Sequence, residues 1–113
     1  NAAYLVDGTI VYLKKNAVLN KPLQVLYLNG QNEENILIQP KNLIVAEENS
    51  QAKIIFHYKG IAEKKYFTNA VTQVFVGKNS IVDFYKIENE SKNSFHIEQT
   101  TIHQEKESVY LPF

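Results

Sequence analysis

Apolar and polar residues alternate in short runs along most of this chain. Alternation with a period of two places the apolar side chains on one face of a β-strand. No stretch carries the 3.6-residue apolar repeat of an amphipathic helix, and the strand-favouring residues Ile, Val, Tyr, Phe and Thr supply 39 of the 113 residues. The pattern therefore predicts an all-β protein. Its strands are expected at 23–28, 36–38, 43–45, 54–58, 71–76, 81–87, 95–98 and 109–113.

A short motif precedes several of these strands at nearly constant spacing. It places Asn before a small residue at Asn16-Ala17, Asn49-Ser50 and Asn79-Ser80, and Glu107-Ser108 is a looser fourth copy, with offsets of 33, 30 and 28 residues. A turn-plus-strand unit that recurs every 20 to 50 residues or so is typical of a solenoid. Because almost nothing predicts a helix, a β-helix is favoured. A β-sandwich or jelly roll also contains many short strands and is the alternative.

Charge and composition argue against several kinds of partner and site. The 12 Lys balance the 12 acidic residues and Arg is absent, which argues against nucleic acid or an anionic membrane as the main partner. Without Cys the chain has no disulfide, thiolate nucleophile or thiolate metal ligand. No apolar run reaches the roughly 18 residues of a membrane span. The four glycines are too dispersed for a dinucleotide or phosphate loop, and the usual catalytic signatures are absent.

Two His–Glu pairs are the candidates for a metal site. His96 and Glu98 lie two residues apart, as do His103 and Glu105, so each pair shares one face of a strand. Two imidazoles and two carboxylates form a ligand set that zinc or iron accepts. Counted straight through, however, the first pair falls on one face and the second on the other, unless the chain bends near Thr100-Thr101. Ordinary surface or ladder residues are the favoured interpretation, and a metal-dependent β-fold enzyme is the rival hypothesis.

The aromatic residues allow a second rival hypothesis, a binding module. A face of aromatic rings can stack against a glycan or a protein ligand. The six candidates for such a face are Tyr58, Tyr66, Phe67, Phe75, Phe84 and Tyr85. Packing within the core and along the strand ladders explains the same residues and is favoured.

Several short segments follow one another in a defined order. Asp7-Gly8-Thr9 precedes a strand, Lys21-Pro22-Leu23-Gln24-Val25-Leu26 follows a turn, and Leu43-Ile44-Val45-Ala46-Glu47 is a strand with an acidic turn. The later segments are Tyr66-Phe67-Thr68-Asn69-Ala70-Val71-Thr72-Gln73-Val74, Gly77-Lys78-Asn79-Ser80, Phe84-Tyr85-Lys86-Ile87, Phe95-His96-Ile97 and Glu107-Ser108-Val109-Tyr110. In this order and spacing the chain resembles the SufB/SufD family from about Tyr4 to Phe113, and SufD more closely than SufB.

The resemblance implies a fold and a role that composition does not show. SufB and SufD are cytoplasmic scaffold subunits, or plastid ones in plants, which assemble iron–sulfur clusters with the ATPase SufC, and their core is a right-handed parallel β-helix. The helical region that binds SufC, the Cys, His and Glu residues implicated in cluster building, and the main SufB–SufD contact lie toward the C-terminal part. This chain is therefore expected to hold the early rungs, and no catalytic, cofactor-binding or metal-binding residue is carried over.

The expected domain is a single partial β-helical core over residues 1–113, with Asn1-Ala2 a candidate cloning scar and the family's C-terminal helical region absent. Its expected role is a cytoplasmic, non-catalytic scaffold segment of a SufD-like subunit, without a cofactor of its own. SufB-like and SufC-like partners would be reached through the full-length parent. A cut β-helix leaves unpaired backbone groups and apolar side chains at its open ends, so self-association through these ends is also expected.

Overall fold

The computed structural model describes residues 3–29, 36–60, 66–89 and 95–113. Within these residues the chain forms eight strands and no helix, which confirms the predicted all-β class. Residues 1–2, interpreted above as a cloning scar, lie outside the described part. The strands are β1 (Ala3–Leu13), β2 (Leu23–Asn29), β3 (Ile36–Ala46), β4 (Gln51–Gly60), β5 (Tyr66–Val76), β6 (Ile81–Asn89), β7 (Phe95–Gln104) and β8 (Val109–Pro112).

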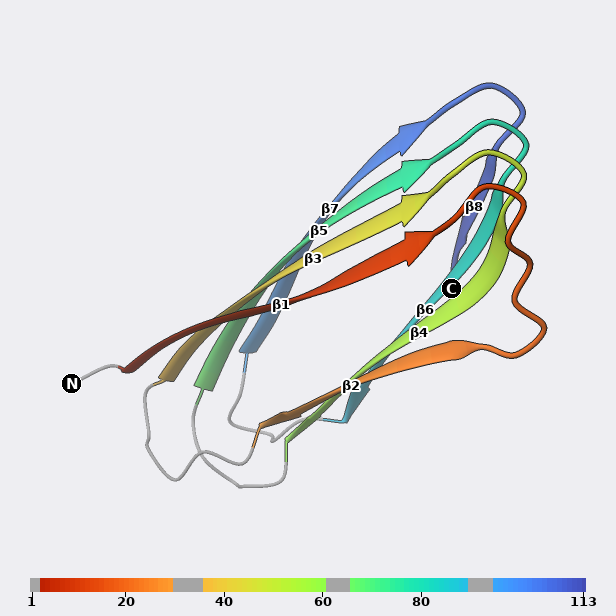
Figure 1. The fold of residues 1–113 in the computed structure, drawn as a ribbon. Coiled ribbons are helices and arrows are strands. Elements are labelled where there is room, and N and C mark those ends of the chain that lie inside the picture. The colour runs from red at the N-terminus through yellow and green to blue at the C-terminus, as the bar shows by residue number, and fades with distance from the viewer. Residues whose placement is uncertain (1–2, 30–35, 61–65, 90–94) are drawn as a thin grey trace.

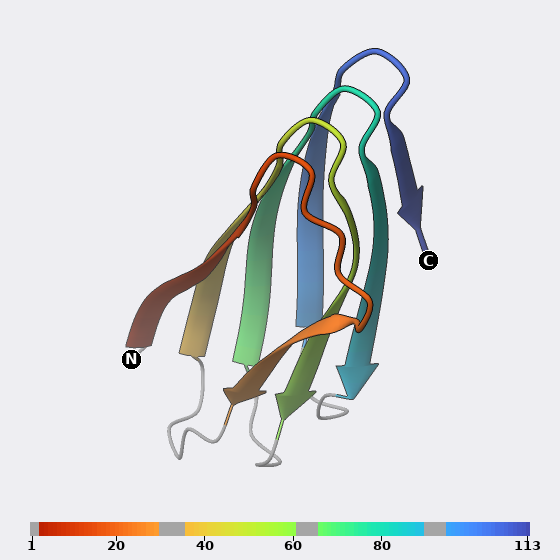
Figure 2. The same ribbon diagram turned by 45° about the vertical axis from the view of Figure 1, so that its right-hand side comes forward.

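Consecutive strands alternate between two sheets that face each other (Figures 1 and 2). One sheet has the order β1-β3-β5-β7 and the other β2-β4-β6-β8. Every pair of neighbours in these sheets is parallel, and each strand lies beside the strand two places later in the chain. We call each odd strand together with the even strand after it a rung, so that rung 1 is β1 with β2 and rung 4 is β7 with β8.

The core lies between the sheets and is built from columns of register partners. Val11, Ile44 and Val74 are successive partners in one sheet, and Phe56 and Phe84 belong to the inner face of the other. Ile44, Val74 and Phe56 are completely buried. Burying one such side chain contributes roughly 1.5–3 kcal/mol. Because the side-chain period is two, a slip of one residue would turn a whole column outward, so these columns fix the register.

A tight turn follows the odd strand of each rung, and the four turns are stacked at one end of the molecule (Figure 2). In rungs 2 to 4 this turn leads directly into the even strand, whereas in rung 1 the nine residues 14–22 separate β1 from β2. The third residue of each turn has a positive φ, and the described non-glycine residues with this conformation are Asn16 (67°), Asn49 (61°), Asn79 (60°) and Glu107 (60°). Asn adopts the left-handed region more readily than most residues. The repeat found in the sequence is therefore the repeat of this turn.

Hydrogen bonds join the turns along the stack. The N–H of Asn16 donates to the carbonyl of Glu48 at 2.9 Å, and the N–H of Asn49 donates to the carbonyl of Lys78 at 3.0 Å. The small residue of the motif contributes as well, because the hydroxyls of Ser50 and Ser80 both donate to the carbonyl of Glu47, at 2.7 and 2.6 Å. Both serines are buried. In the second and third copies the small residue is thus a serine that satisfies this carbonyl, whereas Ala17 in the first copy has no hydroxyl.

The structure corrects the expected boundaries of one strand. The two strands predicted at 36–38 and 43–45 are one strand, β3, which runs through the buried Pro40. Proline lacks an N–H, and the register between β3 and β5 is interrupted at Gln39-Pro40. The register with β1 is continuous over the same residues, so the strand persists.

Alternation missed β1 and the first half of β5. In β1 the outer residues Ile10 and Tyr12 are apolar like the inner ones, and Ile10 is 75% exposed, so the strand shows no clear alternation. In β5 the inner residues Thr68 and Thr72 are polar although both are buried. The alternation of apolar and polar residues fails to predict these segments, because apolar residues lie on the outer face of β1 and polar residues lie on the inner face of β5.

Glu107 occupies a backbone conformation that its three counterparts fill with Asn. The substitution Glu107→Asn is therefore expected to stabilise the fold by about 0.5–1 kcal/mol, because Asn tolerates the left-handed region better. Urea unfolding at constant m-value measures the change. Lys106→Asn, one residue earlier in the same turn, is the matched control and should stay within about 0.5 kcal/mol of the parent. A lower midpoint for Glu107→Asn would contradict this account of the turn.

Candidate functional site

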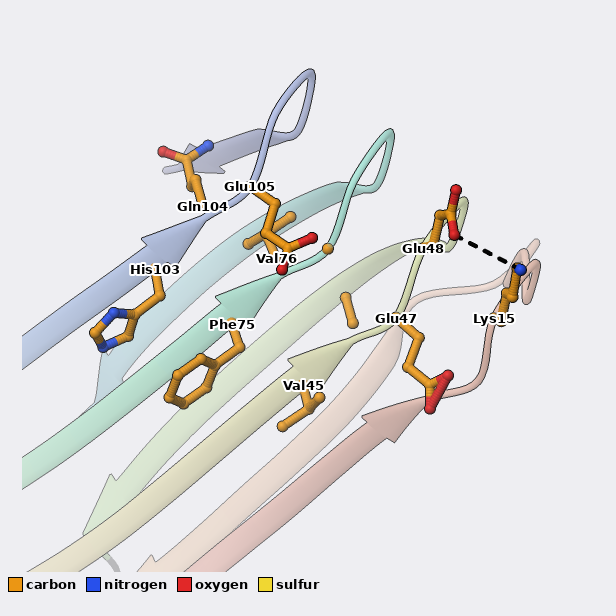
Figure 3. A pocket seen from close by; sticks show the side chains of 11 residues that line it. Lys15, Val45, Glu47, Glu48, Phe75, Val76, His103, Gln104 and Glu105 are labelled. Atoms are coloured by element: carbon orange, nitrogen blue, oxygen red, sulfur yellow. Dashed lines mark ion pairs between the residues drawn. The ribbon is translucent and has the colours of Figure 1, made fainter.

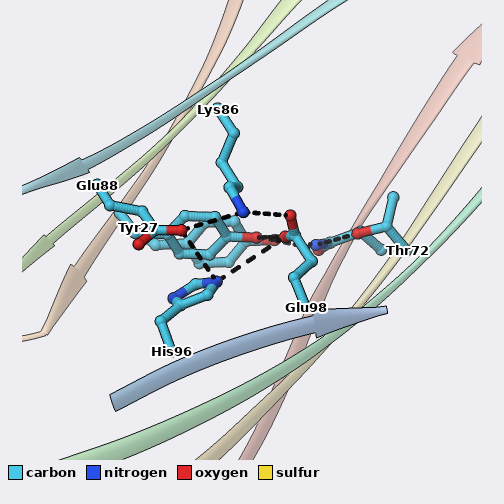
Figure 4. A network of polar contacts seen from close by, with 8 residues as sticks. Tyr27, Thr72, Lys86, Glu88, His96 and Glu98 are labelled. Atoms are coloured by element: carbon cyan, nitrogen blue, oxygen red, sulfur yellow. Dashed lines mark hydrogen bonds and ion pairs between the residues drawn. The ribbon is translucent and has the colours of Figure 1, made fainter. Parts of the chain in front are cut away.

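Polar side chains replace apolar ones at one level of the interior (Figure 4). Thr9, Asn42 and Thr72 are successive register partners in the odd-strand sheet. Tyr27 and Tyr58 are register partners in the facing sheet. Asn42 and Thr72 are buried, so their polar atoms need partners within the protein.

Asn42 is the centre of this polar level. Its side-chain carbonyl accepts a hydrogen bond from the hydroxyl of Tyr27, which also contacts the hydroxyl of Thr9. Its amide Nδ2 donates to the hydroxyls of Tyr58 and Thr72, each at 3.3 Å. One buried amide therefore connects rungs 1, 2 and 3. The Tyr27 and Tyr58 rings also stack, with centroids 5.0 Å apart and an interplanar angle of 9°.

The polar level ends in a charged cluster at rungs 3 and 4. The hydroxyl of Tyr58 donates to Oε1 of Glu98 at 3.2 Å. The ammonium of Lys86 lies 3.0 Å from Oε2 of Glu98 and 3.0 Å from Oε1 of Glu88. Nε2 of His96 lies 3.8 Å from the Glu88 carboxylate and 4.0 Å from that of Glu98, and its ring packs edge-on against Tyr58. We call Tyr27, Asn42, Tyr58, Thr72, Lys86, Glu88, His96 and Glu98 the inner polar network.

Burial and the neighbouring charges shift the pKa values within this network. Burial, followed by the negative charge of Glu98, raises the pKa of the Tyr58 phenol far above its ordinary value. Burial acts to raise the pKa of Glu98, but His96 and Lys86 outweigh it and the net pKa is lowered. Burial acts to lower the pKa of Lys86, but Glu98 and Glu88 outweigh it and the net pKa is raised. At neutral pH the network therefore holds a neutral phenol, a carboxylate and an ammonium.

This arrangement favours a structural role over a chemical one. Lys86 is protonated and held between two carboxylates, so its amine is not available as a nucleophile at neutral pH. Among the described residues, no group of three or more His, Asp or Glu side chains is disposed to hold a metal ion. The network instead joins each rung to the next through polar contacts between buried or half-buried side chains.

The two His–Glu pairs proposed as metal ligands do not come together. His96 and Glu98 point into the interior, with their side chains 6% and 9% exposed. His103 lies on the outer face of the same strand, where its ring stacks on Phe75 at 4.5 Å, and Glu105 follows the end of β7. The register of β7 with β5 is unbroken through Thr100-Thr101, so the side chains of β7 keep alternating between the two faces there. The assignment of the pairs to opposite faces is confirmed.

The six aromatic residues proposed as a stacking face are also dispersed. Tyr58 and Phe84 are buried in the core. Phe75 lies on the outer face of one sheet, and Tyr85 stacks on Phe113 beside the other. Phe67 is half-buried in β5, and the Tyr66 side chain lies outside the described part of the structure. The described members do not share a face, so the glycan-binding platform suggested by the sequence does not form.

The sequence did not point to most of the inner polar network. Asn42, Thr72 and Lys86 stand at inward positions of their strands, but each looks like an ordinary polar residue until the register is known. The detectable signal is the offset between partners: Asn42 and Thr72 differ by 30 residues, close to the spacing of the turn motif. Inward polar residues that recur about every 30 positions could therefore have identified Asn42 and Thr72 as neighbours.

Comparison with known proteins identifies the family. Residues 27–111 match the family model described as the SufBD core domain of the SUF system for iron–sulfur cluster assembly. The chain belongs to the SufB/SufD family. The resemblance read from the ordered segments is thereby confirmed, and the match covers rungs 2 and 3 completely and most of rung 4.

Curated relatives of this SufB/SufD family chain come from bacteria and a plant. It is 32% identical over 118 aligned positions to an iron–sulfur cluster assembly SufBD family protein of Synechocystis, covering 97% of this chain and 26% of the relative. It is 27% identical to the chloroplastic protein ABCI7 of Arabidopsis thaliana, covering 92% and 23%. It is also 27% identical to the iron–sulfur cluster assembly protein SufD of Bacillus subtilis, covering 79% and 20%. The chain thus spans a quarter or less of the length of most relatives it matches.

No solved structure is significantly similar to this SufB/SufD family chain. The described residues contain no helix that is long and apolar enough to cross a membrane.

The charged cluster predicts a pH-dependent stability. Glu98→Gln is expected to lower the free energy of unfolding by about 1–3 kcal/mol at neutral pH, because Lys86 loses a buried ionic partner. The folded pKa of Glu98 lies below its ordinary 4.5, so its contribution is complete above that value and is lost as the pH falls through the folded pKa. The difference between parent and variant should therefore shrink below about pH 4.5 in urea unfolding.

Glu48→Gln is the matched control for this prediction, because it removes a carboxylate from an exposed pair with Lys15. Its effect should stay below about 0.5 kcal/mol at every pH. A Glu98→Gln effect that is equally small, or that does not change in acid, would contradict the proposed role of the network.

Proposed function

We propose that this chain is a structural scaffold segment of a SufD-like subunit in a SufBCD-type iron–sulfur cluster assembly complex. It is non-catalytic by itself, forms a single partial β-helical core domain, and contributes no catalytic, cofactor-binding or metal-binding residue. The parent works in the cytoplasm with SufB-like and SufC-like subunits, and ATP is bound by the SufC-like partner. The cluster is the product of the complex and is not a resident cofactor of this segment.

The observation that carries this proposal is the connectivity of the strands. Consecutive strands alternate between two parallel sheets, so each rung adds one strand to each sheet. This connectivity favours a β-helix over a sandwich, because sandwich sheets are built largely from antiparallel pairs. A coil of this kind is stiff along its axis, since each rung is fixed by its neighbours.

The inner polar network supports a positioning role in particular. Its contacts run without interruption from Tyr27 in rung 1 to Glu98 in rung 4. A buried polar group that loses its hydrogen-bond partner destabilises the fold. Displacing one rung would therefore break hydrogen bonds to the next rung and raise the free energy of the folded state. The segment can thereby hold a distant part of the parent protein in a fixed orientation.

The complex is tested by affinity purification of the full-length parent from its own cells under gentle, anaerobic conditions, with mass spectrometry of the proteins that accompany it. Recovery of a SufC-type ATPase together with SufB is expected. If neither protein exceeds the background of an untagged control, the scaffold role is wrong and the chain shares only the fold and ancestry of the family.

Exposed ends of the stack predict self-association of the isolated chain. Ile102 and Tyr110 belong to the inner columns of rung 4, and with Glu98 and Thr100 they line an open cavity of about 250 Å³. A second copy can cover these residues and pair with the free strand edges. Light scattering after size-exclusion chromatography is expected to show dimers or larger species at high concentration.

Ile102→Lys tests whether the stack end is responsible, because it places a charge on the inner column of the last rung. The variant should be monomeric under conditions in which the unsubstituted 113-residue chain associates. Thr101→Lys, on the outer face of the same strand, is the control and should associate normally. A monodisperse, folded monomer for the unsubstituted chain would contradict the prediction.

A further inference from the structure

The outer face of the odd-strand sheet carries a groove beside the stacked turns (Figure 3). Its volume is about 410 Å³, and none of its lining residues belongs to the inner polar network. Val45, Phe75 and His103 form its apolar floor as register partners on β3, β5 and β7. The Phe75 and His103 rings stack face to face, with centroids 4.5 Å apart and an interplanar angle of 8°, so each ring covers one face of the other.

A glycine lies at the centre of this groove, where the turns stack too closely for a side chain. Glu47, Gly77 and Glu105 are equivalent positions, each directly after the last residue of β3, β5 or β7. A Cβ at Gly77 would lie 2.8 Å from the carbonyl oxygen of Ala46 and 2.9 Å from the backbone nitrogen of Glu48. The turn of rung 2 fills the place of such a Cβ, so of these three equivalent positions only Glu47 and Glu105 carry a side chain.

The rim of the groove carries excess negative charge. Glu48 pairs with Lys15 at 3.6 Å, which neutralises one carboxylate. Glu47 and Glu105 form no ion pair with another residue that the structure describes. They are two strands apart, which separates their backbones by roughly 10 Å. A long cationic side chain can reach both carboxylates from between them.

The floor complements the same kind of side chain. Phe75 is 38% exposed, although it lies in the centre of the sheet. The aliphatic stem of Lys or Arg packs well on apolar surface while its charged head group stays in water. Tyr12, the register partner of Val45 on β1, extends the apolar surface and is 54% exposed. The surface thus offers apolar contact beside two carboxylates.

We propose that this groove docks a segment of a partner protein in which Lys or Arg alternates with apolar residues. The aliphatic stem of the cationic side chain packs against the exposed part of Phe75, with its head group between Glu47 and Glu105. The neighbouring apolar side chains of the partner cover Val45 and Tyr12. Charge complementarity selects this occupant over an acidic segment, and the docking does not depend on assembly with SufB-like or SufC-like subunits.

The test uses the full-length parent and a defined probe. The probe is a fluorescein-labelled heptapeptide in which Leu alternates with Lys or Arg, and the reference is the same peptide with Glu at the charged positions. Fluorescence anisotropy at low salt is expected to show saturable binding of the basic peptide and none of the acidic one. Glu47→Gln/Glu105→Gln should weaken binding by about 5- to 20-fold, since two exposed charge contacts are removed.

Matched variants separate the groove from general charge. Glu107→Gln removes one negative charge two residues from Glu105, outside the groove lining, and should leave the affinity unchanged, whereas Glu105→Gln alone should weaken it. Phe75→Ala, which removes the apolar surface that the stem covers, should weaken it as well. Equal binding of both peptides, no binding by the parent, or equal effects of Glu105→Gln and Glu107→Gln would overturn the proposal. A loss of parent self-association in the double Gln variant would identify a second copy as the occupant and would also overturn it.

Discussion

Register between parallel rungs is the constraint on which the rest of this structure depends. Every strand lies beside the strand of the next rung, so an inner residue of one rung always meets an inner residue of another. The stacked turns set this register, because the third residue of each turn takes the left-handed conformation and the N–H groups of Asn16 and Asn49 bond to the turn of the next rung. A slip at one turn would expose a whole inner column.

The inner polar network makes this register specific as well as stable. An apolar column tolerates some sliding, since one aliphatic contact replaces another. Asn42, by contrast, uses its carbonyl for Tyr27 and its amide for Tyr58 and Thr72, and each bond requires a partner from a particular rung. A shifted rung would leave a buried amide without partners, which costs about 1–3 kcal/mol for each group. The family's β-helical core, as we propose it, is thus held both by apolar columns and by a polar one.

The sequence predicted the turns and the strand class because both leave local signals. Asn followed by a small residue marks a left-handed turn, and its spacing gave the period of the rungs. The faces of His96 and His103 also followed from counting residues along one strand. These inferences need only the backbone period and the preference of Asn for positive φ.

Features that depend on pairing between rungs were not predictable in this way. The continuity of β3 through Pro40 depends on its register with β1, and the burial of Thr68 and Thr72 depends on which face β5 turns inward. The groove was missed because its lining brings together Glu47, Gly77 and Glu105, which are 30 and 28 positions apart in the sequence. Such neighbours become visible only once the rungs are aligned.

Disulfide trapping of the register tests the central claim most directly, because the chain contains no Cys of its own. Gln73 and Thr101 are register partners on the outer face of β5 and β7, whereas Gln99 lies two residues out of register with Gln73. Register partners are about 4.8 Å apart, within the range that a disulfide spans, and the out-of-register pair is separated by roughly 8 Å. Peptide mapping of the oxidised parent protein should show a bond for Gln73→Cys/Thr101→Cys and little or none for Gln73→Cys/Gln99→Cys. Equal trapping of the two pairs, or trapping of the second alone, would contradict the stacked parallel register.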